Sequence, residues 1–387
     1  MPNVTGLDAS MAGRIDEAAA GAVERNDSPG VVAGVACGDT LHIAIAGVTR
    51  IGGSLMARDT LFRITSNTKP MTAAVVLSLV DDGVLRLDQS VETLLPELAD
   101  RRVLRRPDGP LADTVAAERP ITVRDLLTFT WGFGMQGAMF MSPEPWPILT
   151  ATVERQLSTF GPPQPAGAPN PDTWMERLGE LPLLAQPGER WLYSSGSQVL
   201  GVLISRALGI SLDQAMRDRL FTRLGMLDTS FHTTDATRLA TAYTNGPAGF
   251  EVTDGPDGQW SRPPAFPDGS GGLLSTVDDM VAFGRMLLTN DGTVLRESTV
   301  TAMTQNQLSA VQRGNVWPGF SFLDERGWGY GVSVLDDGSY GWDGGFGTTW
   351  RNVPSQDLTM VVLTQRAADH TGMPAVCNEI IDIARSG

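Results

Sequence analysis

Strand-forming runs lie near both ends of this chain, whereas the long middle segment has helical periodicity. Two helices are expected outside the strands, over residues 7–25 and 376–384, where apolar residues recur at helical spacing. Five runs have the length and composition of strands: the apolar runs 31–37 and 41–47, and the later runs 329–335, 348–353 and 358–364. The pattern predicts one sheet to which both chain ends contribute, flanked by helices.

The middle of the chain predicts a second, mainly helical unit. From residue 71 to about residue 231 the long periodic segments are mostly helical, and a proline-rich loop at 161–171 interrupts them. We therefore expect an α/β (α+β) fold with a discontinuous sheet domain, residues 1–75 and 260–387, and a mainly helical domain, residues 76–259. An active site is expected at the interface of the two domains.

Composition and charge narrow the classes of function. Hydrophobic residues make up 42% of the 387 residues and charged residues 19%, which is typical of a globular chain. The formal net charge of −15 opposes binding to phosphate backbones, so no nucleic-acid partner is expected. The first residues lack a secretory pattern and no run reaches the ~18 apolar residues of a membrane span, which predicts a cytoplasmic protein without membrane contact. The sequence shows no metal-ligand cluster and no nucleotide fingerprint, so neither a metal nor a cofactor is expected.

The chain contains a single lysine. All but one of its 29 basic residues are arginines, and the exception is Lys69. A guanidinium stays charged at any workable pH, whereas a desolvated amine can become neutral and accept a proton. The surviving lysine is therefore interpreted as a general base at a position where arginine cannot serve.

Ser66 lies three residues before Lys69, at the start of a strongly helix-forming segment. Side chains at positions i and i+3 of a helix are neighbours, so the Lys69 amine can reach the Ser66 hydroxyl. A helix start also presents unpaired N–H groups that favour a developing oxyanion. Taken alone, the same segment is also explained by a capped helix with Lys69 on the surface. No Gly-x-Ser-x-Gly segment is present, so a nucleophile elbow is not supported.

With Ser66 and Lys69 located, nearly the whole chain resembles the β-lactamase-fold serine hydrolases, which include class C β-lactamases, penicillin-binding proteins and certain carboxylesterases. Residues 62–70 resemble the first motif of that superfamily, and residues 187–201, with Tyr193-Ser194-Ser195, resemble its second motif, Tyr-x-Asn or a Ser variant. The resemblance implies a β-lactamase/transpeptidase-like fold. It also implies that Tyr193 handles protons together with Lys69 and that Ser195 contacts the substrate.

The third motif departs from that of β-lactamases and penicillin-binding proteins. Where they carry Lys-Thr-Gly, and many relatives His-x-Gly, residues 340–345 resemble the Trp-x-Gly version of the carboxylesterase branch. This implies substrate contacts by Trp342, Asp343 and Gly344, and an oxyanion hole formed by the backbone N–H groups of Ser66 and Gly345. Taken alone, the segment is more typical of a glycine-rich hairpin turn. A second departure places Phe129 and Trp131 where relatives usually show His and Ser.

These observations predict a serine carboxylesterase that forms an acyl-enzyme on Ser66, with Lys69 and Tyr193 sharing the abstracted proton. The third motif lacks a lysine to pair with a carboxylate, so the expected partner is a small neutral ester. The residues expected to line an apolar acyl pocket are Trp131, Met139, Phe140, Met141 and Trp174. Three alternatives stay open: hydrolysis of β-lactams or D-amino-acid amides and peptides, acyl transfer to an alcohol other than water, and a non-enzymatic binding protein on the same fold. Asp343 is the candidate ammonium partner for an amide substrate.

Overall fold

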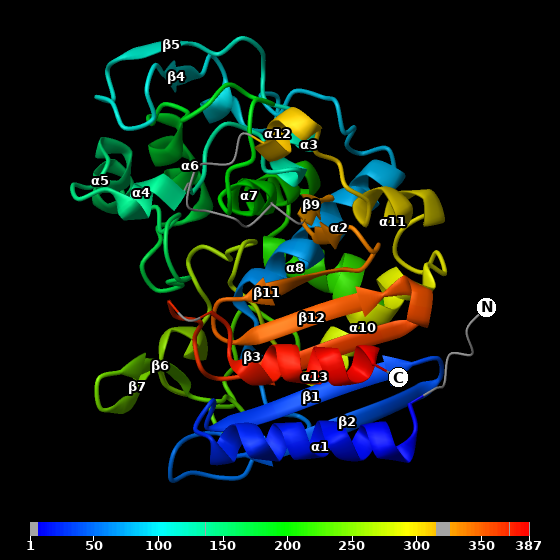
Figure 1. The fold of residues 1–387 in the computed structure, drawn as a ribbon. Coiled ribbons are helices and arrows are strands. Elements are labelled where there is room, and N and C mark those ends of the chain that lie inside the picture. The colour runs from blue at the N-terminus through cyan, green and yellow to red at the C-terminus, as the bar shows by residue number, and fades with distance from the viewer. Residues whose placement is uncertain (1–6, 136, 315–325, 371, 387) are drawn as a thin grey trace.

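The computed structural model describes residues 7–135, 137–314, 326–370 and 372–386. Its centre is a seven-stranded antiparallel sheet of order β2-β1-β13-β12-β11-β10-β9 (Figure 1). The strands are β1 Gly30–Cys37, β2 Thr40–Gly47, β9 Arg326–Trp328, β10 Ser333–Leu335, β11 Tyr340–Gly344, β12 Thr348–Val353 and β13 Leu358–Thr364. The first two strands pair with the last strand of the chain, so the expected sheet from both chain ends is confirmed.

Helices cover both faces of this sheet, which explains why strands β1 and β13 are buried at nearly every position. Alternate residues of β1 serve opposite faces: Val31 packs with the terminal helices α1 (Ala9–Glu24) and α13 (Ala375–Arg385), whereas Val32 belongs to the larger core on the other side. On that second side α10 (Val277–Thr289) contacts β1, β12 and β13. Figure 1 shows α1 and α13 together in front of the sheet.

One expected strand is two strands. The run 329–335 was predicted as a single strand, but β9 ends at Trp328 and β10 begins at Ser333. Between them Gly331 has φ +72°, and a Cβ atom there would lie 2.6 Å from the Ala73 side chain. The chain therefore turns at this glycine against α2 instead of continuing as a strand.

The rest of the chain is mostly helical and surrounds α2. The other α-helices are α2 Thr68–Asp81, α3 Val123–Leu127, α4 Gly137–Met141, α5 Pro147–Glu154, α6 Pro171–Gly179, α7 Gly196–Leu208, α8 Leu212–Met216, α9 Thr222–Leu224, α11 Glu297–Met303 and α12 Ala310–Gly314. Residues Thr68 to Leu79 of α2 are all buried, as expected for a helix that is apolar on every side. This helix carries Lys69 into the interior of the molecule.

Three small two-stranded sheets complete the fold. They pair β3 Phe62–Arg63 with β8 Leu274–Ser275, β4 Arg102–Leu104 with β5 Thr114–Ala116, and β6 Ala242–Gly246 with β7 Gly249–Asp254. Two of them lie within the segment 76–259 that was expected to be mainly helical. The division of the chain into domains at residues 75 and 260 stays a prediction.

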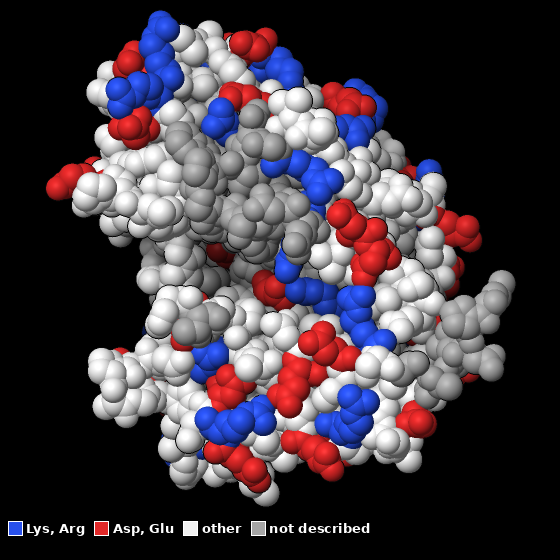
Figure 2. All heavy atoms as spheres, in the orientation of Figure 1, with Lys and Arg blue, Asp and Glu red and all other residues white. Residues whose placement is uncertain are grey.

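Acidic and basic side chains are interspersed on the face drawn in Figure 2. Several form ion pairs across elements, such as Arg25 with Glu379 at 2.7 Å between the end of α1 and α13. In the ranges that the structure describes, no single helix is both long and apolar enough to cross a membrane, although α7 and the helical segment Leu212–Leu224 meet the criterion as a pair bent by 83°.

Candidate active site

Ser66 and Lys69 lie together at the start of α2. Ser66 is the middle residue of a 3₁₀ turn, Thr65–Asn67, that leads directly into the helix, and the preceding Thr65 has φ +41°. The Lys69 Nζ atom lies 2.9 Å from Ser66 Oγ and donates to the Ser270 carbonyl at 2.6 Å. The i, i+3 spacing therefore brings the amine to the hydroxyl, as the sequence predicted.

The surroundings of Lys69 favour its neutral form. Its side chain is 2% exposed, and burial lowers the pKa of the amine to about 7, against the opposing effect of the negatively charged Asp268. At neutral pH a large fraction of the amine therefore has a free lone pair. This is the property that arginine lacks.

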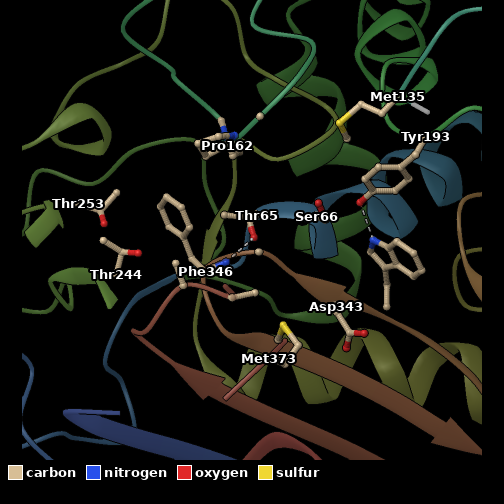
Figure 3. A pocket seen from close by; sticks show the side chains of 16 residues that line it. Thr65, Ser66, Met135, Pro162, Tyr193, Thr244, Thr253, Asp343, Phe346 and Met373 are labelled. Carbon is tan, nitrogen blue, oxygen red and sulfur yellow. Dashed lines mark hydrogen bonds between the residues drawn. The ribbon is translucent and has the colours of Figure 1, made fainter. Parts of the chain in front are cut away.

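Tyr193 reaches Ser66 from the loop before α7. The centre of its ring lies 4.8 Å from Lys69 Nζ, and its hydroxyl forms side-chain hydrogen bonds with Ser66 and with Trp342, whose Nε1 donates at 3.1 Å (Figure 3). Burial raises the pKa of the phenol well above its ordinary value, and these two hydrogen bonds only partly offset the effect. Tyr193 is therefore a neutral phenol that can donate a proton, and Lys69 is the better base.

An aromatic cluster packs against Tyr193. It contains Phe129, Trp191, Trp328 and Trp342. Trp342 packs edge to face on Trp328 with their ring centroids 4.7 Å apart, and the ring centroids of Phe129 and Trp328 are 4.9 Å apart. Phe129 adopts φ +58°, a conformation that costs energy for a non-glycine residue and persists only where packing fixes it. The sequence offered no contact for Phe129, and the structure assigns it to the support of Tyr193.

A pocket of about 550 Å³ opens in front of these residues. Met135 and Tyr193 lie at one side, Phe346 occupies the middle, and Thr244 and Thr253 lie beyond it (Figure 3). Trp342 also lines this pocket. Thr244 and Thr253 belong to the hairpin of β6 and β7. Sequence reasoning missed both threonines because nothing local distinguishes them from other strand residues.

Asp343 lines the pocket but its charge is compensated. Arg351 donates to both of its carboxylate oxygens at 2.8 Å, and the Thr349 hydroxyl donates at 2.6 Å. Burial opposes its ionisation, but Arg351 and Thr349 hold the pKa of this carboxyl below its usual value. The expectation that Asp343 binds the ammonium group of an amide substrate is therefore corrected, because its partners are already in the protein.

Adjacent glycines of the third motif have different roles. A Cβ atom on Gly344 would lie 2.2 Å from Thr348 Oγ1 and 2.3 Å from the Ile64 carbonyl, so glycine is needed for β11 to approach the turn of Ser66. Gly344 is buried and does not line the pocket, which corrects its expected contact with substrate. Gly345 is exposed, lines the pocket together with Ser66, and would accommodate a Cβ atom.

Known proteins match this architecture along nearly its full length. The model of the beta-lactamase family matches residues 15–376. The chain belongs to the beta-lactamase family. Esterase EstB from Burkholderia gladioli is 31% identical over 407 residues, which cover 96% of this chain and 95% of that protein. Protein Rv1367c from Mycobacterium tuberculosis (strain ATCC 25618 / H37Rv) is 37% identical over 341 residues, 82% and 80% of the two chains.

Solved structures with this fold are similar over the whole chain. The structure of EstCE1, titled a hydrolase with promiscuous acyltransferase activity, aligns with a TM-score of 0.79 and covers 97% of this chain and 98% of that one at 23% identity. At this identity the likeness shows the fold. The β-lactamase/transpeptidase-like fold implied by the motifs is thus confirmed, and the chain is placed among the β-lactamase-fold hydrolases.

Within this beta-lactamase family member, several residues expected at the substrate lie elsewhere. Ser195 is fully buried and donates to the Phe133 carbonyl at 2.8 Å. Trp174 is fully buried with its Nε1 bonded to the Leu157 carbonyl at 2.8 Å, and Trp131 lies in the same core. Of the other residues expected in the acyl pocket, Met139 lies in the core, whereas Phe140 and Met141 are exposed. Trp131, Met139 and Trp174 are therefore core residues, as is usual for large apolar side chains.

The described part of the chain contains no group of three His, Cys, Asp or Glu side chains arranged to hold a metal ion. Its two cysteines are free, and burial raises the pKa of the Cys377 thiol far above its ordinary value. The polar side chains that line the pocket include those of Ser66, Tyr193, Thr244, Thr253 and Asp343.

Proposed function

We propose that this protein is a serine carboxylesterase that cleaves neutral esters through an acyl-enzyme on Ser66. The observation that carries the proposal is the buried Lys69 amine, 2.9 Å from Ser66 Oγ and with a pKa near 7. A nucleophilic hydroxyl needs an adjacent base of about this strength to be activated at neutral pH. No other lysine exists in the chain to take this role.

In the acylation step the neutral Lys69 amine takes the Ser66 proton as Oγ attacks the ester carbonyl. The backbone N–H groups of Ser66 and Gly345 stabilise the oxyanion that forms. Tyr193 gives its phenolic proton to the departing alkoxide, and the Lys69 ammonium returns a proton to the resulting phenolate. Water then attacks the acyl-enzyme, and the same two side chains carry its proton back to Ser66 Oγ as the acid leaves.

Charge and pocket lining support neutral substrates. The carboxylate that lines the pocket, Asp343, is paired with Arg351, so it offers no free charge to a substrate. Trp342 stands where a lysine would pair with the carboxylate of a β-lactam, and it is engaged with Tyr193. Phe346, Met135 and Met373 supply apolar surface for the acyl or alcohol group. The EstB relative is itself named an esterase.

A panel of p-nitrophenyl esters assayed beside nitrocefin tests the proposal. We expect ester hydrolysis to exceed β-lactam hydrolysis. An organophosphonate should label Ser66, and Ser66→Ala should abolish both labelling and hydrolysis. Labelling that persists in Ser66→Ala would place the nucleophile elsewhere. Product analysis in the presence of added alcohols measures acyl transfer by the same intermediate.

A further inference from the structure

The Lys69 amine is held by a loop that none of the three motifs includes. Its Nζ donates to the Ser270 carbonyl at 2.6 Å, and Thr72, one turn further along α2, donates to the Gly269 carbonyl at 2.7 Å. A Cβ atom on Gly269 would lie 2.7 Å from the Ser197 carbonyl of α7. The loop is thus fitted between α2 and α7, and its backbone fixes where the amine sits.

Asp268 shapes this loop. Its side chain is almost fully buried, and its Oδ1 accepts the Ser270 N–H at 2.6 Å, which closes a turn of the Asx type. Its backbone carbonyl accepts the N–H groups of Gly271 and Gly272. Asp268 therefore holds the peptide of Ser270 in the orientation that presents its carbonyl to Lys69.

The same carboxylate is tied to the helix that follows Tyr193. Gln198 of α7 is 2% exposed and donates from Nε2 to Asp268 Oδ2 at 3.1 Å. The contacts run from Gln198 through Asp268 and Ser270 to Lys69, and so connect the helix that follows Tyr193 with the amine. Ser195, the last residue of the Tyr-x-Ser motif, takes no part in this chain of contacts, because its hydroxyl donates to the Phe133 carbonyl.

We propose that Asp268 is a positioning residue of the reaction: it orients the Ser270 carbonyl that holds Lys69, and it supplies the negative charge that faces the ammonium form during turnover. The inference rests on the proposed function of Ser66 and Lys69. The other titratable groups near the amine are Tyr193, whose ring faces it, and Asp343, which acts on Tyr193 and is paired with Arg351.

The charge of Asp268 has a defined consequence. A nearby carboxylate stabilises the ammonium and raises its pKa, which opposes the larger effect of burial on Lys69. Removal of that charge should lower the pKa of Lys69 further, by about one unit. At a pH one unit below the wild-type value, the neutral fraction of the amine would then rise about fivefold. A residue with a merely structural role would not change this titration.

The single lysine allows a direct measurement. Protein grown with lysine labelled with ¹³C at Cε gives one lysine resonance, that of Lys69, and its chemical shift against pH reports the pKa in wild type and in Asp268→Asn. The rate at which an organophosphonate inactivates Ser66 is followed over the same pH range. We expect the Lys69 titration and the acid limb of inactivation to move together to lower pH in Asp268→Asn.

Two further variants make the result decisive. Asp268→Ser can keep the turn through its hydroxyl while it removes the charge, and it is used if Asp268→Asn does not give folded protein. Asp278→Asn is the matched control, because it removes an equal charge from an exposed pair with Arg58. A Lys69 titration in the folded Asp268 variant that coincides with that of wild type and Asp278→Asn would overturn the inference. Failure of wild-type Ser66 to be labelled would instead overturn the proposed function.

Discussion

At the scale of single residues, Lys69 carries the most specific prediction, because its amine is buried beside Ser66. Lys69→Arg should be nearly as damaging as Lys69→Ala, since a guanidinium cannot lose its proton at working pH. We expect each variant to lose more than tenfold in kcat/KM for a p-nitrophenyl ester, or over ~1.4 kcal/mol of transition-state stabilisation. An Arg variant that keeps more than a tenth of wild-type activity would show that charge alone is sufficient.

The pH dependence of the reaction follows from the same amine. Only the neutral form of Lys69 can accept the Ser66 proton, and burial lowers its pKa to about 7. The value of kcat/KM for a neutral ester should therefore rise with pH and level off above an apparent pKa near 7. Initial rates between pH 5 and 9 measure this limb. A flat profile across that range would be incompatible with a lysine base.

Lys69 should also make the folded state sensitive to pH. Its pKa is lowered from 10.5 in the unfolded chain to about 7, so the unfolded state binds more protons between these values and stability rises as pH increases from 7 to 10.5. Below pH 7 the amine is charged in both states, and its burial lowers the free energy of unfolding by the full amount, at most about 5 kcal/mol. Lys69→Met should therefore stabilise the fold at pH 6 and have a smaller effect near pH 10, as measured by urea unfolding. Equal effects of Lys69→Met at both pH values would show that the buried charge is not the cause. The stabilisation is reduced because the substitution also removes the positive charge near Asp268.

At the scale of elements, strand β11 presents Trp342 to Tyr193. Trp342→Phe should keep most of the edge-to-face packing in the cluster and remove the Nε1 donor that lies 3.1 Å from the phenol. We expect kcat/KM to fall about tenfold, the ~1–1.5 kcal/mol of one hydrogen bond, with little change in thermal stability. Trp328→Phe is the matched control, because its Nε1 points to the Leu127 carbonyl in the same cluster. Similar losses in the two variants would indicate a packing effect.

Sequence periodicity correctly predicted strands whose side chains are buried along nearly their whole length. The runs 348–353 and 358–364 were predicted with the bounds that β12 and β13 have, because both faces of these strands are covered and nearly every position is buried. The run 329–335 failed because one glycine, Gly331, turns the chain against α2. Local pattern contains no information about such a tertiary contact.

The site residues also divide into those that local sequence predicts and those that depend on tertiary contacts. Ser66 and Lys69 were found from one helical spacing and one unusual residue count, which are properties of the local sequence. Trp131 and Trp174 were assigned to the pocket because they are large and apolar, but these properties describe core residues equally well. Thr244, Thr253 and Phe346 line the pocket only because distant segments meet there, and no local signal marks them.

At the scale of the whole molecule, the site depends on three distant parts of the chain. Ser66 lies in the turn before α2 and Lys69 in its first turn, Tyr193 comes from the middle of the chain, and Trp342 and Gly345 come from β11 and the residue after it. The pocket is completed by the hairpin of β6 and β7, which lies beside the sheet in Figure 1. Contacts that fix this hairpin to the turn of Ser66 should therefore affect both stability and activity.

A buried ion pair makes that connection. Arg63, two residues before the turn of Ser66, donates from Nε to Asp254 at the end of β7 at 2.8 Å, and both side chains are less than 7% exposed. Asp254→Asn would leave the guanidinium without a counter-charge in a site that excludes water, which costs about 3–5 kcal/mol. We expect a large fall in the free energy of unfolding, together with weaker ester binding as the hairpin loses its anchor.

Asp278→Asn, which breaks an exposed pair with Arg58, is the control and should cost less than about 1 kcal/mol. The double variant Arg63→Met/Asp254→Leu removes both charges and should recover much of the stability lost by Asp254→Asn, because replacing a buried pair with apolar groups is far cheaper than breaking it. If urea unfolding shows equal losses for Asp254→Asn and Asp278→Asn, the Arg63 charge is solvated when its partner is removed and the hairpin is held by its other contacts.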